Sequence, residues 1–251
     1  MALAKAHADA GLGREHIRPF VDANCSKGRR GFGTRATKKN LAQKKPSWEN
    51  TLTNAIMGGA KETFVLLVID LEHTGHGSYS SDILQIGAVG ALFTMLAEAP
   101  ANVISSYDGQ VLFDFNMDIR TDQLLNKNLD VVFHRNFPRQ KIRDASPFLE
   151  VMSAFRSEVL TLKSGLPPNT KLLIAAHNGY VSDFSVLHCQ FQRHGQSFAD
   201  FLISMDVEGF VDTLVIAREL NLPTKLSDLY KRLTGIELSN AHDAGADADA
   251  A

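Results

Sequence analysis

The chain has 251 residues and a mass of 27.5 kDa, enough for one large domain or for an ordinary domain with an extension. Hydrophobic residues make up 44% and charged residues 22%, with 18 Gly and 8 Pro, so wholesale disorder and a collagen-like repeat are excluded. The longest uncharged apolar stretch, Ile86–Ala97, is too short for a membrane span. Two cysteines, Cys25 and Cys189, cannot form a disulfide framework, so we expect a reducing compartment inside the cell.

The formal charge of −2 is unevenly divided along the chain. Eight Lys and Arg and no acidic residue lie between Lys27 and Lys45, against 28 Asp and Glu in the whole chain. Glycines and polar residues without apolar periodicity predict that residues 1–60 form a flexible basic extension of an acidic body. This extension is interpreted as a solvated linker, a phosphate-binding arm or a nuclear address. Nuclear or cytoplasmic location is favoured, and organelle import stays an alternative, which Asp9 and Glu15 weaken.

Apolar patterning predicts one organised domain over residues 61–251. Short β-branched and aromatic runs predict strands at Phe64–Ile69, Ile83–Phe93, Gln110–Phe115, Lys171–Ala176 and Phe210–Asp212. Helical spacing predicts helices at Pro147–Leu162, from Ser182 to about Gly195, at Thr213–Leu220, at Ser227–Leu233 and from Asn240 onward, with a loop at Asn126–Asn136. Strands that come first and then alternate with helices predict an α/β fold, in which helices flank a mixed five-stranded sheet.

An Asp-x-Glu pair ends the first expected strand. Asp70 and Glu72 are separated by one residue, so in an extended chain both carboxylates point to one side and can face one or two cations. Asp206 and Glu208 repeat the spacing, which alone is more typical of a solvated strand end. Only the first pair is followed by a Thr74-Gly75 turn and by a strand that can pair back as a hairpin.

Two later segments carry residues suited to the same chemistry. Asp183 follows a buried strand and a short turn, in the first turn of a helix, where the macrodipole favours an ionised carboxylate. Asn178 in that turn could orient a substrate hydroxyl or could only satisfy the turn backbone. His242 and Asp247 can share a site only if His242 precedes the helix that carries Asp247, because five helical residues separate side chains by about 140°. Taken alone, each of these residues is more typical of an ordinary helix start or surface.

In chain order the three segments read D-x-E at a strand end, H-N-x4-D at a strand-to-helix turn and H-x4-D at a late helix. This order resembles the DEDDh family of 3′-to-5′ exonucleases, which have an RNase H-like fold. The phrases VIDLEHTG, DILQIGAV and GFVDTLVIAREL add to the resemblance, which covers about Glu62–Ala251. The step from Asn178 to Asp183 is most similar to that of the three-prime repair exonuclease branch.

The resemblance implies a role for each matching residue. His242 would be the general base, and an imidazole of ordinary pKa takes up a proton near neutral pH. Two divalent cations would be held by Asp70, Glu72, Asp183 and Asp247. Four hard carboxylates suit Mg²⁺ or Mn²⁺ better than zinc. The terminal nucleotide would be bound near His73, Thr74, Gly75, His76 and Asn178.

Some positions depart from the family pattern. His73 and His76 replace a small or uncharged residue and an apolar wedge, which alters the expected grip on the 3′ nucleotide, although an imidazole can stack on a base. A zinc site built from these two histidines lacks a second ligand pair with metal spacing. The sequence stops four residues after Asp247, where a ligand-bearing helix normally continues, so we expect a fragment or a shortened chain.

We therefore expect a metal-dependent 3′-to-5′ exonuclease that releases nucleoside monophosphates from the free 3′ end of single-stranded nucleic acid, DNA being favoured over RNA. The expected cofactors are two Mg²⁺ or Mn²⁺ ions, and no membrane partner is expected. Two alternatives stay open: an exoribonuclease acting on short or structured RNA, and a nuclease-derived module that binds nucleic acid without cutting it. The oligomeric state cannot be inferred from the sequence.

Overall fold

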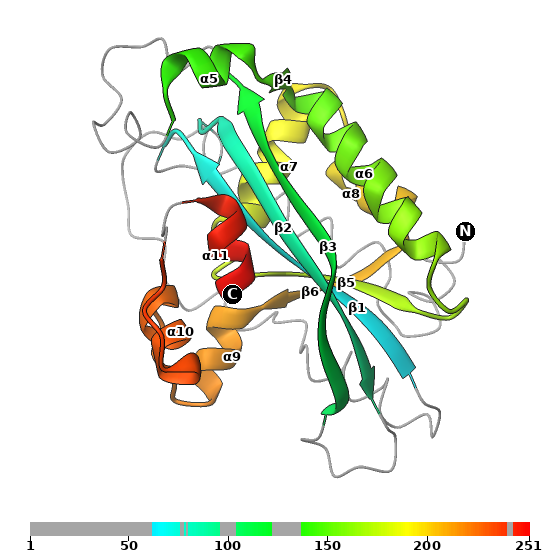
Figure 1. Cartoon of the computed structure of the whole chain (residues 1–251). Coiled ribbons are helices and arrows are strands. Elements are labelled where there is room, and N and C mark those ends of the chain that lie inside the picture. The colour runs from blue at the N-terminus through cyan, green and yellow to red at the C-terminus, as the bar shows by residue number, and fades with distance from the viewer. Residues whose placement is uncertain (1–61, 76–77, 79, 96–103, 122–136, 240–242) are drawn as a thin grey trace, which may run out of the picture.

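The apolar runs of the sequence pair into one six-stranded sheet in the order β4-β3-β2-β1-β5-β6 (Figure 1). Its strands are β1 (Glu62–His73), β2 (Ile83–Met95), β3 (Ile104–Arg120), β4 (Ser146–Pro147), β5 (Lys171–Ala176) and β6 (Val207–Asp212). β2 runs antiparallel to β1 and β3, whereas β5 runs parallel to β1 and β6, and β4 runs parallel to β3. The sheet is therefore mixed, as the sequence predicts.

The computed structural model describes residues 62–75, 78, 80–95, 104–121, 137–239 and 243–251. The predicted basic extension and the predicted loop at Asn126–Asn136 lie outside the described residues, as do two predicted site residues, His76 and His242. Among the described residues, no helix is both long enough and apolar enough to cross a bilayer.

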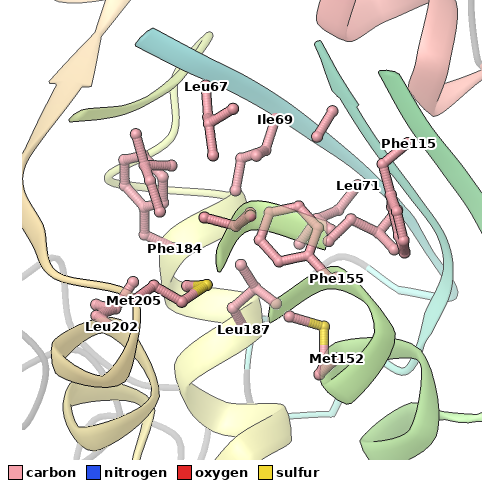
Figure 2. Close-up of a cluster of buried hydrophobic side chains, with 14 of the residues drawn as sticks. Leu67, Ile69, Leu71, Phe115, Met152, Phe155, Phe184, Leu187, Leu202 and Met205 are labelled. Carbon is pink, nitrogen blue, oxygen red and sulfur yellow. The ribbon is translucent and has the colours of Figure 1, made fainter. Parts of the chain in front are cut away.

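Helices lie on both faces of the sheet. On one face, α6 (Phe148–Ser164), α7 (Asp183–Arg193) and α8 (Phe198–Ser204) enclose the main core with the strands (Figures 1 and 2). On the other face, α11 (Ala244–Ala250) packs against β1 and β2 (Figure 1). The remaining helices are α5 (Arg139–Asp144), α9 (Thr213–Glu219) and α10 (Leu226–Thr234).

The core depends on the alternation of buried side chains along β1 from Val65 to Leu71. Leu67, Ile69 and Leu71 are buried and point toward α6 and α7, where they meet Phe155 and Leu187 (Figure 2). Because successive side chains of a strand point to opposite faces, the residues between them face α11 instead. One strand thus supplies both the core and the surface on which α11 packs.

Four elements differ from the sequence-based expectation, and two of them are the short helices α5 and α8, which the sequence pattern does not predict. The sheet has a sixth strand, β4, whose two residues pair with Ile119 and Arg120 at the end of β3. So short a strand leaves no periodic signal, and its Pro147 is tolerated because β4 lies at the sheet edge. β3 is also longer than the predicted Gln110–Phe115, because pairing with β2 extends it through polar residues in both directions. The other predicted strands and helices appear within a few residues of their expected bounds.

Candidate functional site

Asp70 and Glu72 lie near the end of β1 on the face that meets α11. The core side chains of this strand point the other way (Figure 2), so the alternation of the strand directs both carboxylates to one side. Across the antiparallel pair, Asp70 lies opposite Gly87 and Glu72 lies opposite Gln85. The one-residue spacing therefore places both carboxylates on the same side of β1, as the sequence predicts.

Asp183 approaches the same point from the start of α7. β5 pairs with β1 only as far as Val68 and Ala175, so the last residues of β1 have no β5 neighbour. The backbone N–H of Leu71 donates instead to Oδ1 of Asp183 at 3.0 Å. Leu71 lies between Asp70 and Glu72, so this bond brings Asp183, which is only 3% exposed, beside the pair.

A buried carboxylate on β6 holds the turn that precedes α7. Asp212, which is 5% exposed, accepts from the backbone N–H groups of Asn178 at 3.0 Å, Tyr180 at 3.2 Å and Leu214 at 3.0 Å. Asn178 has a left-handed backbone, with φ of 62°, which asparagine tolerates better than most residues. The predicted substrate residue Asn178 thus lies in the turn that leads to Asp183.

Asp247 reaches the site from α11 because the helix lies very close to the sheet. A Cβ atom on Gly87 would lie 2.1 Å from the carbonyl carbon of Ala244, so only glycine permits this approach. Asp243 caps the helix through a bond from the backbone N–H of Ala246 at 3.2 Å, and it also accepts from the side chain of Asn116 at 3.3 Å. These contacts fix the first turn of α11, which carries Asp247.

Carboxylates from distant parts of the sequence therefore converge. Ligand oxygens of Asp70, Glu72 and Asp247 all lie within 4.8 Å of one another, and this group could hold a metal ion. Asp183 lies close enough to raise the pKa of both Asp70 and Glu72 by charge repulsion. The described structure thus brings the four predicted acids together, whereas their role as ligands stays a prediction.

The carboxyl groups are strongly perturbed. Burial raises the pKa of Asp70 well above its usual range, and the charges of Asp183, Glu72 and Asp247 raise it further. Burial also raises the pKa of Glu72 to about 7, with the charges of Asp247 and Asp183 adding to it. For Asp183, burial raises the pKa to about 7 against the lowering effect of two backbone hydrogen bonds. Buried acids that repel one another are stabilised by a nearby cation, so this donor set fits a divalent metal.

The loop after β1 holds the other predicted substrate residues. Thr74 is tied to Asp82 twice: its N–H donates to the Asp82 carbonyl at 2.9 Å, and its Oγ1 accepts from the Asp82 N–H at 3.0 Å. A Cβ atom on Gly75 would lie 3.0 Å from Oγ of Ser81, which makes the turn tight. His73 is half-buried at the end of β1. The structure therefore places His73 at the end of β1, directly after Glu72, and Thr74 and Gly75 in the ordered turn that follows.

The second Asp-x-Glu pair has a different environment. Asp206 forms an ion pair with Lys163 at 2.9 Å, and Glu208 lies 4.0 Å from Lys171. Each carboxylate of this second pair therefore lies beside a lysine, and neither belongs to the group of described acids that could hold a metal. By contrast, no ion pair among the described residues joins a lysine to Asp70 or Glu72. The two Asp-x-Glu pairs thus share their spacing but differ in their surroundings.

Three residues that support the site were not singled out from the sequence. Gln85 is the one polar side chain in the run ILQIGAV, and such an exception could have marked it. Asp212 ends a strand and directly precedes a helix, which is the usual position of an N-cap Asp. Gly87 carried no such signal, because its role depends on a helix more than 150 residues away.

Comparison with solved structures shows the fold. The nuclease domain of 3′hExo, a DEDDh family member bound to rAMP, matches at 14% identity over 76% of this chain and 88% of that chain, with a TM-score of 0.51. Cell-death related nuclease 4 (CRN-4) matches at 16% identity over 75% of this chain and 60% of that chain, with a TM-score of 0.51. The chain therefore has the RNase H-like fold of these exonuclease domains.

Exonuclease I of E. coli, in complex with a dT13 oligonucleotide, matches at 20% identity with a TM-score of 0.49. The match covers 75% of this chain but only 39% of the E. coli protein. No protein-family model and no curated protein sequence matches this chain.

Proposed function

We propose that this protein is a metal-dependent nuclease that removes nucleotides one at a time from the 3′ end of a nucleic acid strand. The observation that carries the proposal is the convergence of Asp70, Glu72 and Asp247, whose ligand oxygens lie within 4.8 Å of one another. The motif order of the DEDDh exonucleases and the shared fold of the 3′hExo nuclease domain support it.

The proposed cofactors are two Mg²⁺ or Mn²⁺ ions held by Asp70, Glu72, Asp183 and Asp247. When bound, such ions stabilise the negative charge on both the attacking and the leaving oxygen of a phosphodiester. The protein contributes the placement of the carboxylates: two are fixed on a paired strand, and two are brought to it by helix starts. Four carboxylate ligands favour these hard cations, which prefer oxygen donors.

His242 is the proposed general base, and it precedes the Asp243 cap of α11 by one residue. A neutral imidazole accepts the proton of the attacking water near neutral pH. The proposed substrate contacts are His73, Thr74, Gly75, His76 and Asn178. Of these, His73 lies at the end of β1, Thr74 and Gly75 lie in the turn after it, and Asn178 lies in the turn that leads to Asp183.

The proposed partner is nucleic acid with a free 3′ end, and single-stranded DNA is favoured over RNA. An exoribonuclease is the second candidate, because the 3′hExo nuclease domain of the same fold was solved with rAMP bound. Residues 1–60, with their excess of positive charge, are proposed to attract the phosphate backbone to the exonuclease domain at 61–251. Nuclear or cytoplasmic location accords with this role.

The test is digestion of 5′-labelled single-stranded DNA and RNA with Mg²⁺, Mn²⁺ or EDTA. The parent chain is expected to give a one-nucleotide ladder that needs a divalent ion. Asp70→Asn and His242→Ala are expected to remove the ladder. Asp206→Asn is the matched control, because it changes the same residue type in the same spacing, but in the pair that lysines neutralise.

Three other outcomes would contradict the proposal. Cutting that persists unchanged in Asp70→Asn would assign the activity to a contaminant. Binding of the oligonucleotide without any ladder would identify a non-cutting binding module. Products that start from internal positions would show an endonuclease instead.

A further inference from the structure

Gln85 has its amide group fully engaged between β3 and α11. Its side chain is only 4% exposed and lies opposite Glu72 on the face of the sheet that meets α11. Oε1 accepts from the backbone N–H of Ala244 at 2.9 Å. Nε2 donates to Oδ1 of Asp118 at 3.3 Å and to Oδ2 of Asp243 at 3.5 Å. One buried side chain therefore bonds to both the first residue and the cap of α11.

The orientation of this amide is fixed by its neighbours. Asp118 is an acceptor, so the NH₂ group of Gln85 must point to it, and the oxygen must then face the N–H of Ala244. Lys141 of α5 forms an ion pair with the other oxygen of Asp118 at 2.8 Å. A flipped amide would place the NH₂ group against the N–H of Ala244 and the oxygen against the Asp118 carboxylate. The amide is therefore held in one orientation, and the start of α11 is bonded to it.

Apolar burial alone would not fix the position of α11. Only Ala244 and Ala248 are buried on this helix, and two methyl groups contribute little directional constraint. Asp247 lies one turn after the bonds to Gln85, at the oxygen cluster with Asp70 and Glu72. A shift of the helix start would therefore carry Asp247 away from the other two carboxylates.

We infer that Gln85 is a positioning residue that sets the distance between Asp247 and the carboxylates of β1, and thereby the affinity of the site for divalent cations. This inference rests on the proposed function for the identity of the cation. Gln85 itself touches neither the cation nor the substrate in this assignment, because its three hydrogen bonds go to α11 and to Asp118.

The test substitutes Gln85→Met, which keeps the length of the side chain and removes all three hydrogen bonds. Mn²⁺ affinity, measured on the full chain by electron paramagnetic resonance, is expected to fall about tenfold. Amide hydrogen exchange is expected to rise in residues 244–250 and to stay unchanged in β1 and β5. In activity assays, kcat at fixed Mg²⁺ is expected to fall while KM for the oligonucleotide stays the same.

A double-mutant cycle separates positioning from a general loss of stability. If Gln85 acts through Asp247, Gln85→Met should change Mn²⁺ affinity in the parent but not in the Asp247→Asn background. Equal losses in both backgrounds would overturn the inference. Asp118→Ala, a milder change at a more exposed residue, is expected to weaken Mn²⁺ binding about threefold by releasing the amide.

Gln140→Met is the matched control. Gln140 is exposed on α5 and bonds only within its own helix, to Asp144 at 2.8 and 2.9 Å, so Mn²⁺ affinity should not change. A parent chain that binds Mn²⁺ but leaves DNA and RNA intact would overturn the proposed exonuclease and leave this inference in place. A Gln85→Met chain that binds Mn²⁺ and cuts as the parent does would overturn the inference and leave the exonuclease in place.

Discussion

Two helices bring a carboxylate to the same pair on β1, but they are attached to the sheet in different ways. α7 is part of the core: its residues from Asp183 to Phe191 are all buried, and Asp183 itself bonds to the β1 backbone. α11 lies on the opposite face, buries only Ala244 and Ala248, and is positioned by polar contacts and by one glycine. Half of the site is thus part of the folded core, and the other half is docked onto it.

This difference predicts that stability and the proposed metal binding can be changed separately. Damage on the α7 side should appear in the unfolding of the whole domain, because the same residues pack the core. Damage on the α11 side should appear in cation affinity and in catalysis, because little apolar area depends on that helix. Each side has a glycine at its closest approach, and the pair offers the sharpest comparison.

Gly87→Ala and Gly179→Ala should give opposite patterns. A Cβ on Gly87 meets backbone atoms of Ala244 at 2.1 Å, so α11 must move away, and activity is expected to fall about a hundredfold with little change in Tm. A Cβ on Gly179 meets Ala176 and Phe184 at 2.7 Å inside the core, which should cost about 1–3 kcal/mol of unfolding free energy.

Thermal denaturation and a Mg²⁺ titration of nuclease activity on both variants measure the two effects. Gly209→Ala is a suitable control, because its Cβ would make only ordinary contact, 3.5 Å from Leu173. If Gly87→Ala lowered Tm as much as Gly179→Ala does, the distinction between a core half and a docked half would be wrong.

The second expectation concerns pH. Without divalent cations, the raised pKa values of Glu72 and Asp183, both about 7, mean that the folded chain binds more protons than the unfolded chain between about pH 4 and 7. Stability should therefore fall as pH rises through this window, by roughly 1.4 kcal/mol per pH unit for each extra proton that the folded chain binds. Mg²⁺ should restore it at pH 8 and should have little effect at pH 5.

Denaturation curves at pH 5 and pH 8, with Mg²⁺ and with EDTA, test this expectation. Glu72→Gln should reduce the dependence on pH, because the neutral amide has no proton to release. Asp206→Asn should leave the dependence unchanged, since that carboxylate is exposed and paired with Lys163. A parent chain that is more stable at pH 8 than at pH 5 in EDTA would contradict the electrostatic description of the site.

Asp212→Asn tests the α7 side with a smaller change. In the parent chain the N–H of Tyr180 donates to the Asp212 carboxylate at 3.2 Å. In the variant the amide keeps one acceptor oxygen, but its NH₂ group faces that N–H. We expect a loss of about 1–3 kcal/mol in unfolding free energy and no more than a twofold change in Mn²⁺ affinity. Urea denaturation and Mn²⁺ titration are the measurements, and a large loss of affinity without a loss of stability would assign Asp212 to the docked half.

Asn116→Ala should give the smallest effect, on the α11 side. It removes one exposed hydrogen bond, of 3.3 Å, to the Asp243 cap, while the bonds of Gln85 stay in place. The Mg²⁺ concentration for half-maximal activity is expected to rise about twofold, with Tm unchanged. An effect as large as that of Gln85→Met would show that the cap, and not the amide, holds the helix.

The part of the site that lies on β1 could be predicted because its geometry is local. Alternation along a strand places Asp70 and Glu72 on one side whatever the rest of the chain does. The start of α7 followed from apolar patterning on both sides of a short turn, which placed Asp183 in the first helical turn. Local sequence patterns were therefore sufficient to predict the positions of Asp70, Glu72 and Asp183 on their elements.

The support of the site could not be predicted in the same way. Gly87, Gln85 and Ala244 are brought together by the packing of α11 on β2, which no local pattern encodes. The two-residue strand β4 is decided by its pairing with β3 and not by its own composition. The sequence context already set the second Asp-x-Glu pair apart, but the lysines beside it, Lys163 and Lys171, come from α6 and β5 and could not be predicted.

The alternation of β1 also determines which genetic changes the protein can absorb. Its odd-numbered positions pack the interior and its even-numbered positions carry the acids, so point substitutions can alter one set without disturbing the other. Insertion or deletion of one residue between Leu67 and Asp70 would exchange the two sets in a single event, turning carboxylates inward and leucines outward. We therefore expect β1 to tolerate substitutions during evolution but not the insertion or deletion of a residue.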